Sequence, residues 1–257
     1  MSGRSAADIR RQLSVEQNVI AQLLATGKKK EAMKKIVSAS KKGMADMLDL
    51  PYQGKRVGDV DEYKEAKKLT DELFQKVWKV YWGGAPFPLQ KLMGFGDEDY
   101  MITLYQGMDV AGVFNQSSAG MDDRLKAWFV LGFYAFTYEL ASRPLLSYTN
   151  VLTAKNTYTK AGVAVDLLKT KYKVTILKDY FEPFLRNSID HSSYILTNMK
   201  AGTFDAWNTV KGKKTGKKEY DVASVFRMTV RSLFFIIAYY CSWYELVIEL
   251  DRRGALH

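Results

Sequence analysis

The chain has 257 residues, 47% of them hydrophobic, and its 38 basic and 28 acidic side chains give a formal net charge of +10. A chain of this length and composition can bury an ordinary core without disulfides or structural metals, which excludes a small cross-linked scaffold. Its single cysteine, Cys241, cannot form an intramolecular disulfide, and the N-terminal segment lacks the apolar core of a signal peptide. We therefore expect a globular, cytoplasmic protein.

The excess of basic residues predicts a polyanionic partner, which could be nucleic acid, a nucleotide or an anionic membrane face. Lysines gather in two stretches, residues 28–42 and the segment KGKKTGKK at 211–218. Each stretch taken alone is equally typical of a solvated surface. The two stretches and the net charge together favour an anionic partner.

Apolar residues at helical spacing predict a series of helices. The first two, over residues 5–25 and 28–48, form a basic helical hairpin that turns at Gly27. Further helices are expected over residues 59–82, 98–108, 127–143 and 161–171. The uncharged run AWFVLGFYAFTY predicts a buried central helix that ends near Pro144, since proline disrupts a helix interior.

Alternating residues are rare, and they indicate one small β-hairpin. Its strands are expected at 194–197 and 203–207, on either side of NMKAG. The remaining pattern predicts an all-α helical bundle. We divide it into a basic N-terminal helical region, 1–100, and a second helical bundle, 101–257.

The most apolar segment, RSLFFIIAYYCSWYELVIEL, lies near the C-terminus. Its charge-free part runs only from Ser232 to Tyr244, which is shorter than the roughly 18 residues that a membrane span needs. We therefore predict a core helix and no integral membrane span. Peripheral membrane association through its tyrosines and Trp243 is an open alternative.

Familiar catalytic signatures are absent. The sequence contains no HExxH, no CxxC and no phosphate-binding loop, and its two histidines are too few for a metal cage. Cys241 is a poor candidate nucleophile, because apolar and aromatic neighbours raise a thiol pKa. We expect no metal and no cofactor, so acid/base or electrostatic chemistry is what remains.

The segment FLRNSIDHSSYIL carries the candidate site, with Arg186, Asn187 and His191 as the catalytic set. Residues five apart on one helix lie about 140° apart around its axis, so Arg186 and His191 would not share a face. We predict that Pro183 breaks the helix and that Asn187 caps a new one. Such a helix start would bring Arg186 against His191 and present free amides to a phosphate.

A guanidinium, an imidazole and a phosphate-binding helix start are suited to metal-free cleavage of RNA. His191 could exchange a proton with the ribose 2′-hydroxyl or the leaving oxygen, since its unperturbed pKa near 6.5 allows both roles. Arg186 could stabilise the negative charge of the transition state. Asn187 either positions the phosphate or only caps the helix.

The motif RNSIDH resembles the R-x4-6-H motif of the HEPN superfamily, in which a polar residue commonly follows the arginine. The following segment is similar to HEPN-type sequences that lead through a small hairpin into a final apolar helix. The resemblance covers roughly the C-terminal half of the chain. It implies a homodimeric helical bundle that brings two such motifs into one cleft and acts as a metal-independent endoribonuclease.

The same resemblance implies a toxin, defence or RNA-processing setting, with an antitoxin or defence-system partner. Tyr194 stands three residues after the histidine, not two as in the subfamily whose toxin is modified on tyrosine, so that regulation is not expected here. The motif occurs again as RRGALH at 252–257, where Gly254 and the chain end argue against an ordered site.

Besides peripheral membrane association, a second alternative stays open. The chain could be a catalytically inactive HEPN-like module that binds nucleic acid or a protein partner. In that case Arg186 and Asp190 would form a structural ion pair, and His191 would be a buried core residue.

Overall fold

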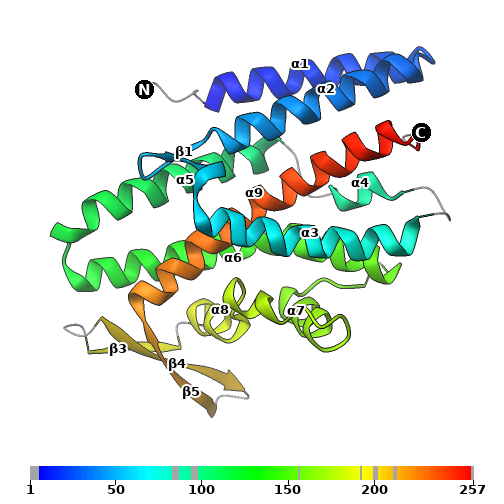
Figure 1. The fold of residues 1–257 in the computed structure, drawn as a ribbon. Coiled ribbons are helices and arrows are strands. Elements are labelled where there is room, and N and C mark those ends of the chain that lie inside the picture. Colours follow the sequence, from blue (N-terminus) through cyan, green and yellow to red (C-terminus); the bar gives the residue numbers. More distant parts are fainter. Residues whose placement is uncertain are drawn as a thin grey trace. The chain divides into compact units, whose positions relative to one another are not determined.

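The computed structural model describes residues 6–82, 87–93, 98–155, 157–191, 193–198, 202–210 and 213–255. Most of them are helical, which confirms the predicted fold class (Figure 1). The α-helices are α1 (Ala6–Ala25), α2 (Lys29–Leu48), α3 (Asp61–Tyr81), α4 (Leu89–Leu92), α5 (Glu98–Ser117), α6 (Asp123–Thr153), α7 (Ala161–Thr170), α8 (Pro183–Asp190) and α9 (Val222–Arg252). Short 3-10 helices cover Val57–Asp59, Ser118–Gly120 and Thr175–Asp179. The strands are β1 (Pro51–Tyr52), β2 (Lys55–Arg56), β3 (Tyr194–Asn198), β4 (Thr203–Val210) and β5 (Lys213–Asp221).

The chain forms two compact units, which are described separately. Unit 1 comprises Met1–Gln106 and Ile237–His257, and unit 2 comprises Gly107–Ile236. Helices α5 and α9 each contribute residues to both units. The domains predicted from the sequence, 1–100 and 101–257, differ from these units mainly in where the C-terminal half of α9 belongs.

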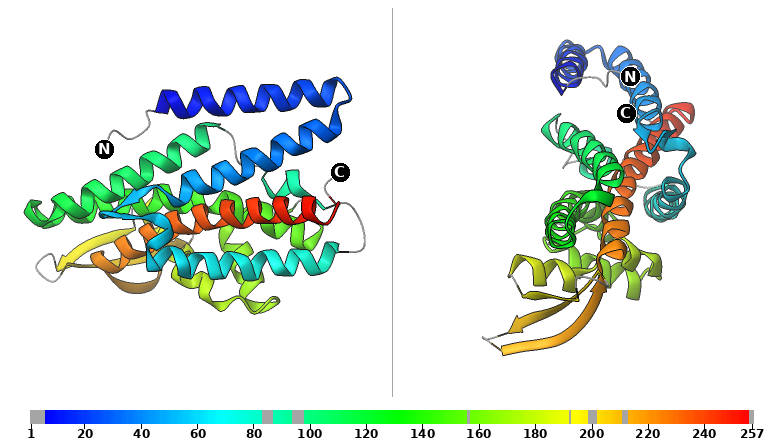
Figure 2. Two further views of the ribbon diagram at one scale, coloured as in Figure 1. Left: turned by 45° about the horizontal axis from the view of Figure 1, so that its top comes forward. Right: turned by 90° about the vertical axis from the view of Figure 1, so that its left-hand side faces the viewer.

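Unit 1 begins with the predicted basic hairpin, in which α1 and α2 run side by side (Figures 1 and 2). Gly27 adopts φ +74° at the turn, a backbone conformation that glycine reaches without steric cost. Helix α2 buries Ala32, Val37 and Met47, and its lysines lie on the exposed side. The pattern of apolar and basic residues therefore predicted this hairpin correctly.

Helix α3 packs against the C-terminal half of α9 within unit 1. Lys67 Nζ lies 2.5 Å from Asp71 Oδ1 and 2.7 Å from Glu245 Oε2 on α9. Ser242 Oγ donates to Asp71 at 2.8 Å, so the buried hydroxyl of α9 is satisfied by a partly exposed carboxylate of α3. The neighbouring Cys241 is fully buried, and burial raises the pKa of its thiol from 9.0 to about 11, as the sequence predicted in direction.

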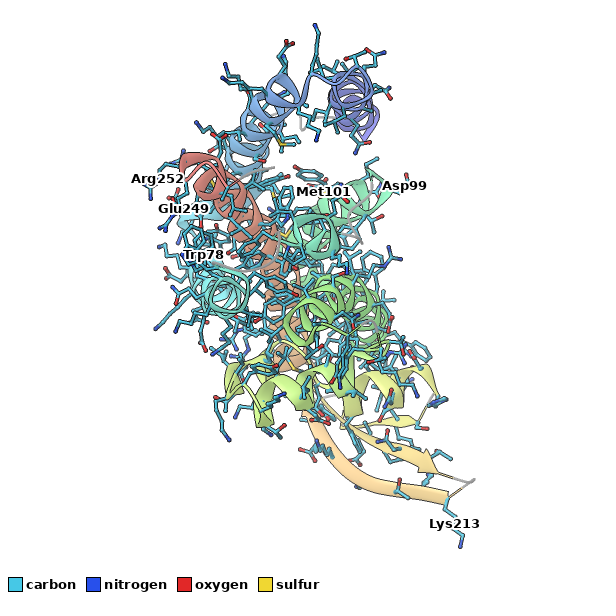
Figure 3. All side chains as sticks on the ribbon, turned by 90° about the vertical axis from the view of Figure 1, so that its right-hand side faces the viewer. Trp78, Asp99, Met101, Lys213, Glu249 and Arg252 are labelled. Carbon is cyan, nitrogen blue, oxygen red and sulfur yellow. The ribbon has the colours of Figure 1, made fainter. Side chains whose placement is uncertain are left out.

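Arg253, directly after α9, contacts two stacked tryptophans at the end of α3. Trp78 and Trp82 stack with centroids 4.5 Å apart, and the Arg253 guanidinium lies 4.8 Å from the Trp82 ring. Glu249 accepts hydrogen bonds from Arg252 (Figure 3). These contacts fix the C-terminal end of the helix within unit 1.

The central helix of unit 2, α6, does not end at Pro144 as predicted but continues to Thr153. Its start is capped by Asp122, whose carboxylate accepts from the Arg124 amide at 2.9 Å. Pro144 removes one backbone hydrogen bond, at a cost of about 3 kcal/mol. The helix persists because the apolar residues on both sides of the proline are buried, including Leu140, Ala141, Leu145 and Tyr148.

The predicted hairpin of unit 2 is present and is extended by a third strand. β3 pairs antiparallel with β4, with Tyr194 opposite Ala206, and β4 pairs with β5 over most of its length. Gly216, at φ +62°, occupies a bulge in β5. Strand β5 contains the second lysine cluster, which the sequence did not identify as a strand.

Helix α9 is, among the residues that the structure describes, the one helix long and apolar enough to cross a bilayer. The core helix of a soluble protein passes the same test, and 61% of the relevant window is buried. Side chains from Ser232 to Ser242 are all buried. This burial agrees with the prediction of a core helix.

Candidate functional site

The three predicted site residues lie in α8 and directly after it, but the helix starts earlier than expected. Pro183 is its first residue, and the Arg186 amide already donates to the Glu182 carbonyl at 3.1 Å. Asn187 lies inside the helix and His191 directly follows its last residue, with the His191 amide donating to the Asn187 carbonyl at 3.1 Å. The predicted break before Asn187 and the cap at Asn187 are therefore wrong. Proline is favoured at the first helical position, where its φ is preset and no amide hydrogen is needed.

This correction changes which side chains can act together. Asn187 and His191 are four residues apart at the end of α8, a spacing that places two side chains on one face. Arg186 and His191 are five residues apart with no intervening break, so they point in directions about 140° apart. The phosphate-binding helix start expected at Asn187 is absent. The structure thus groups Asn187 with His191 and separates Arg186 from both.

Arg186 is held between two carboxylates. Its Nη2 lies 2.6 Å from Glu139 Oε1 on α6, and its Nε donates to the same oxygen at 2.7 Å. Its Nη1 lies 2.5 Å from Asp190 Oδ2, one turn further along α8. The Arg186–Asp190 ion pair is the one expected if the chain is a catalytically inactive module. These contacts use three of the five guanidinium N–H groups, and the two carboxylates already offset the positive charge that a phosphate would meet.

His191 is exposed, so the expectation of a buried core histidine is wrong. The hydroxyl of Ser193 donates to the His191 carbonyl at 3.3 Å and lies 3.2 Å from the hydroxyl of Thr209 on β4. The Ser193 amide donates to the Ser188 carbonyl at 2.7 Å. These bonds tie the end of α8 to the sheet while the imidazole stays accessible to a ligand.

The start of α8 is fixed by a buried tyrosine. The Tyr134 hydroxyl donates to the Glu182 carbonyl at 3.2 Å and accepts from the Glu182 amide at 3.0 Å. Burial raises the pKa of Tyr134 well above its usual value, so it remains a neutral phenol. Burial first, and then the Glu182 carboxylate, also raise the pKa of Tyr220. Both phenols therefore stay neutral and do not act as bases, and Tyr134 is the one whose hydroxyl holds the start of α8.

The antiparallel pair β4–β5, hereafter the lysine ribbon, lies against α8. Ser188 Oγ donates to the Trp207 carbonyl at 3.0 Å, and Lys218 Nζ lies 4.7 Å from the Phe184 ring centroid. The ribbon's lysines at 213, 214, 217 and 218 are all exposed. Figure 3 shows Lys213 at the far end of the ribbon, pointing away from the helices of unit 2. The second lysine cluster is thus placed beside the candidate helix.

The four lysines of the ribbon differ in their partners. Lys217 Nζ lies 2.8 Å from Asp205 Oδ2, and Lys218 Nζ lies 3.2 Å from Glu182 Oε1. Within the described part of the chain, Lys213 and Lys214 have no carboxylate at ion-pair distance. Lys214 Nζ instead lies 3.8 Å from the Trp207 ring centroid. Lys213 and Lys214 are therefore the cations of the ribbon that are most available to an anionic ligand.

No family model, curated protein or solved structure matches this chain. The HEPN resemblance consequently rests on RNSIDH and its helical setting, and a function has to be argued from the site itself.

Two residues of the site were missed by the sequence reasoning. Glu139 is separated by 47 positions from Arg186, its ion-pair partner, and no local pattern marks it. Trp207 was assigned to a hairpin strand, but its place next to Lys214 depends on β5. The alternation of β5 is masked by four lysines and a glycine, so only the pairing with β4 reveals it.

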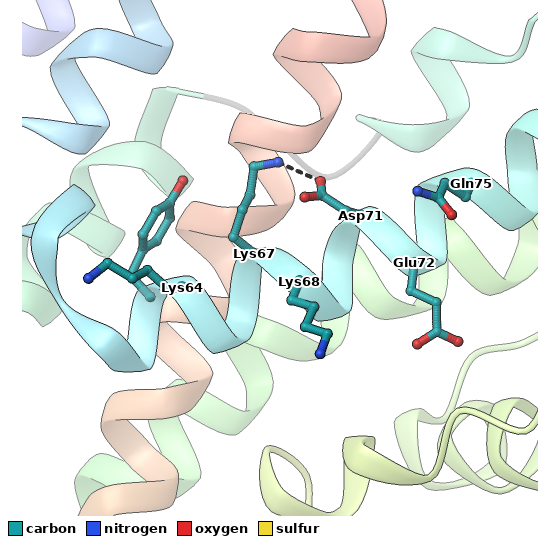
Figure 4. A pocket seen from close by; sticks show the side chains of 7 residues that line it. Lys64, Lys67, Lys68, Asp71, Glu72 and Gln75 are labelled. Atoms are coloured by element: carbon teal, nitrogen blue, oxygen red, sulfur yellow. Dashed lines mark hydrogen bonds and ion pairs between the residues drawn. The ribbon is translucent and has the colours of Figure 1, made fainter.

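A second polar feature lies in unit 1, along α3 (Figure 4). It is a groove lined by Tyr63, Lys64, Lys67, Lys68, Asp71, Glu72 and Gln75. The Lys67–Asp71 ion pair occupies its middle. In the described ranges, no group of three or more His, Cys, Asp or Glu side chains is placed to hold a metal. Mixed charges that already pair with one another suit a structural role for this groove.

Proposed function

We propose that this protein binds RNA through the lysine ribbon and the neighbouring end of α8. The observation that carries the proposal is the arrangement of four exposed lysines on a two-stranded ribbon that packs on the helix holding Asn187 and His191. A ribbon of this kind can follow a phosphate backbone, and neutralising phosphates releases counterions. The net charge of +10 favours the same class of ligand.

Neutralising the two available lysines tests this proposal. The double variant K213Q/K214Q should weaken binding of a labelled single-stranded RNA, followed by fluorescence anisotropy, by about 10-fold at moderate salt. The matched control is K34Q/K35Q on α2, which removes two exposed lysines from unit 1 and changes the net charge equally. Equal losses in both variants would show that overall charge, and not the ribbon, governs binding.

RNA cleavage is a second candidate function, favoured by the exposure of His191 beside Asn187. We propose that His191 removes the proton of a ribose 2′-hydroxyl or protonates the leaving 5′-oxygen. The 2′-oxygen would attack phosphorus as the bond to the 5′-oxygen breaks, leaving a 2′,3′-cyclic phosphate. Arg186 would contact the phosphate through the guanidinium N–H groups that do not bond to Glu139 or Asp190, and the HEPN resemblance suggests that a second copy of the chain completes the site.

Cleavage is tested with purified protein in EDTA. Single-stranded RNA should yield fragments with cyclic phosphate ends, and His191→Ala should abolish that yield. His257→Ala is the matched control, because it removes the only other histidine of the chain. Undiminished cleavage by His191→Ala would refute the catalytic role while leaving RNA binding intact.

A further inference from the structure

Trp207 lies on the face of the lysine ribbon that is turned away from α8. Phe204 and Ala206 on the same strand are buried, and side chains alternate between the two faces of a strand. Trp207 is therefore on the opposite face from these core residues, and it is partly exposed. A partly exposed aromatic ring in the middle of a basic ribbon offers a flat apolar surface among cations.

The backbone of Trp207 is fixed from two directions. Its amide donates to the Ser193 carbonyl at 2.9 Å, and its carbonyl accepts from Ser188 Oγ at 3.0 Å. The bulge at Gly216 lies directly next to the Trp207–Lys217 pair, and a bulge redirects the side chains around it. The ring is thus mounted on a rigid part of the sheet, which reduces the entropy that a ligand would lose on binding to it.

The group that lies over the Trp207 ring is a lysine side chain that a ligand can displace. Lys214 Nζ sits 3.8 Å from the ring centroid, a cation–π contact, and Lys217 lies opposite Trp207 in the strand pairing. A lysine side chain is flexible and exposed here, so a planar group can replace it on the ring while its charge moves to a phosphate.

We propose that Trp207 is a base-stacking residue and that the ligand of the ribbon is single-stranded nucleic acid with unpaired bases. This inference rests on the RNA binding proposed above and specifies its ligand class. Every nucleobase has a π-face, so stacking on one ring combined with lysine contacts to phosphate binds single strands with little sequence preference. A duplex keeps its bases stacked inside and cannot use the ring in this way.

The same hydrogen bonds connect the backbone of the stacking residue, through Ser193, to the backbone of the candidate histidine. Ser193, whose carbonyl accepts from the Trp207 amide, also donates its hydroxyl to the His191 carbonyl. The Ser193 hydroxyl lies 3.2 Å from that of Thr209, two residues after Trp207. A base on Trp207 would therefore be bound on the strand that is tied to the end of α8.

The test compares three probes with the full-length protein: an oligouridine of about 12 nucleotides, an RNA duplex of that length, and inorganic polyphosphate of similar charge. Trp207→Leu should weaken oligouridine binding by about 5- to 100-fold, the range for loss of one stacked base, and leave polyphosphate binding within about two-fold. Trp128→Leu is the control, because Trp128 is the other tryptophan of unit 2 and is 60% exposed.

Tryptophan fluorescence provides an independent measurement that does not depend on the leucine variant being stable. Oligouridine should quench the emission of the wild type, and Trp207→Phe should remove most of that quenching while retaining most of the affinity. Unchanged oligouridine affinity in Trp207→Leu, with wild-type RNA binding intact, would overturn the stacking role alone. Failure of the wild type to bind any of the three probes would overturn the proposed function as well.

Discussion

At the level of single side chains, the state of Arg186 decides what the end of α8 can do. Its guanidinium already makes charge-assisted contacts with Glu139 and Asp190, and its side chain is only 30% exposed. Two carboxylates cancel its positive charge toward an incoming phosphate. The pair with Glu139 also joins α8 to α6, so it stabilises the helix that presents His191. We infer that Arg186 is a positioning residue as long as both contacts persist.

Removing the charge of Glu139 should make the Arg186 guanidinium more available to a phosphate. We expect Glu139→Gln to raise the affinity for single-stranded RNA by about 3- to 10-fold, because the neutral amide no longer offsets the charge of the guanidinium toward a phosphate. Glu72→Gln on α3 is the matched control, since Glu72 forms an exposed ion pair with Lys76 and loses the same charge. A similar gain in both variants, measured by fluorescence anisotropy, would argue that only net charge matters.

Cys241 predicts a loss of stability at high pH. Burial raises its pKa from 9.0 to about 11 in the folded protein, so the folded state keeps a proton that the unfolded state has released. The thiol therefore leaves the free energy of unfolding unchanged below about pH 9. As the pH rises from 9 toward 11, ionisation of the unfolded state lowers that free energy by about 2 to 3 kcal/mol. Urea unfolding at pH 8 and pH 10.5 should show a smaller loss for Cys241→Ala than for the wild type. Equal losses would exclude this thiol as a source of the pH dependence.

Among the secondary-structure elements, the periodic spacing of apolar residues predicted most helices correctly. It did not predict where α8 begins. The hairpin of α1 and α2 and the pairing of β3 with β4 follow from local pattern, and both are present. Two prolines misled the prediction in opposite ways. Pro183 starts a helix that was expected to break there, and Pro144 lies inside a helix that was expected to end there. Local sequence shows that a proline inside a helix costs a hydrogen bond. It does not show that α6 is buried around Pro144 by residues distant in the chain, and this burial offsets the cost.

The lysine ribbon depends on Gly216 for both its backbone and its contact with α8. Gly216 adopts φ +62°, and a Cβ built there would lie 3.2 Å from Phe184 Cε2. Gly216→Ala should therefore lower the free energy of unfolding by about 2 kcal/mol, from the left-handed backbone and from crowding against the ring. Gly202→Ala is the control, because Gly202 has φ +67° but no atom within 4 Å of its Cβ position. It should cost about 1 kcal/mol, and a loss as large as that of Gly216→Ala in chemical denaturation would contradict the packing argument.

For the molecule as a whole, basic residues are distributed over both units, so net charge alone does not locate an interface. The exposed lysines of α2 belong to unit 1, and those of β5 belong to unit 2. The sequence marked both clusters and did not distinguish them. The structure distinguishes them, because Lys214 and Lys218 of β5 lie beside the rings of Trp207 and Phe184, and Phe184 belongs to α8, the helix that ends next to His191.

The salt dependence of RNA binding separates the two clusters quantitatively. Each phosphate contact on a single strand contributes about 0.7 to the slope of log affinity against log salt concentration. K213Q/K214Q should therefore reduce the slope by about 1.4, whereas K34Q/K35Q should leave it nearly unchanged. Both variants lower the formal net charge from +10 to +8, so a uniform electrostatic attraction would change both slopes alike. A reduced slope only in K34Q/K35Q would move the interface to α2 and contradict the ribbon.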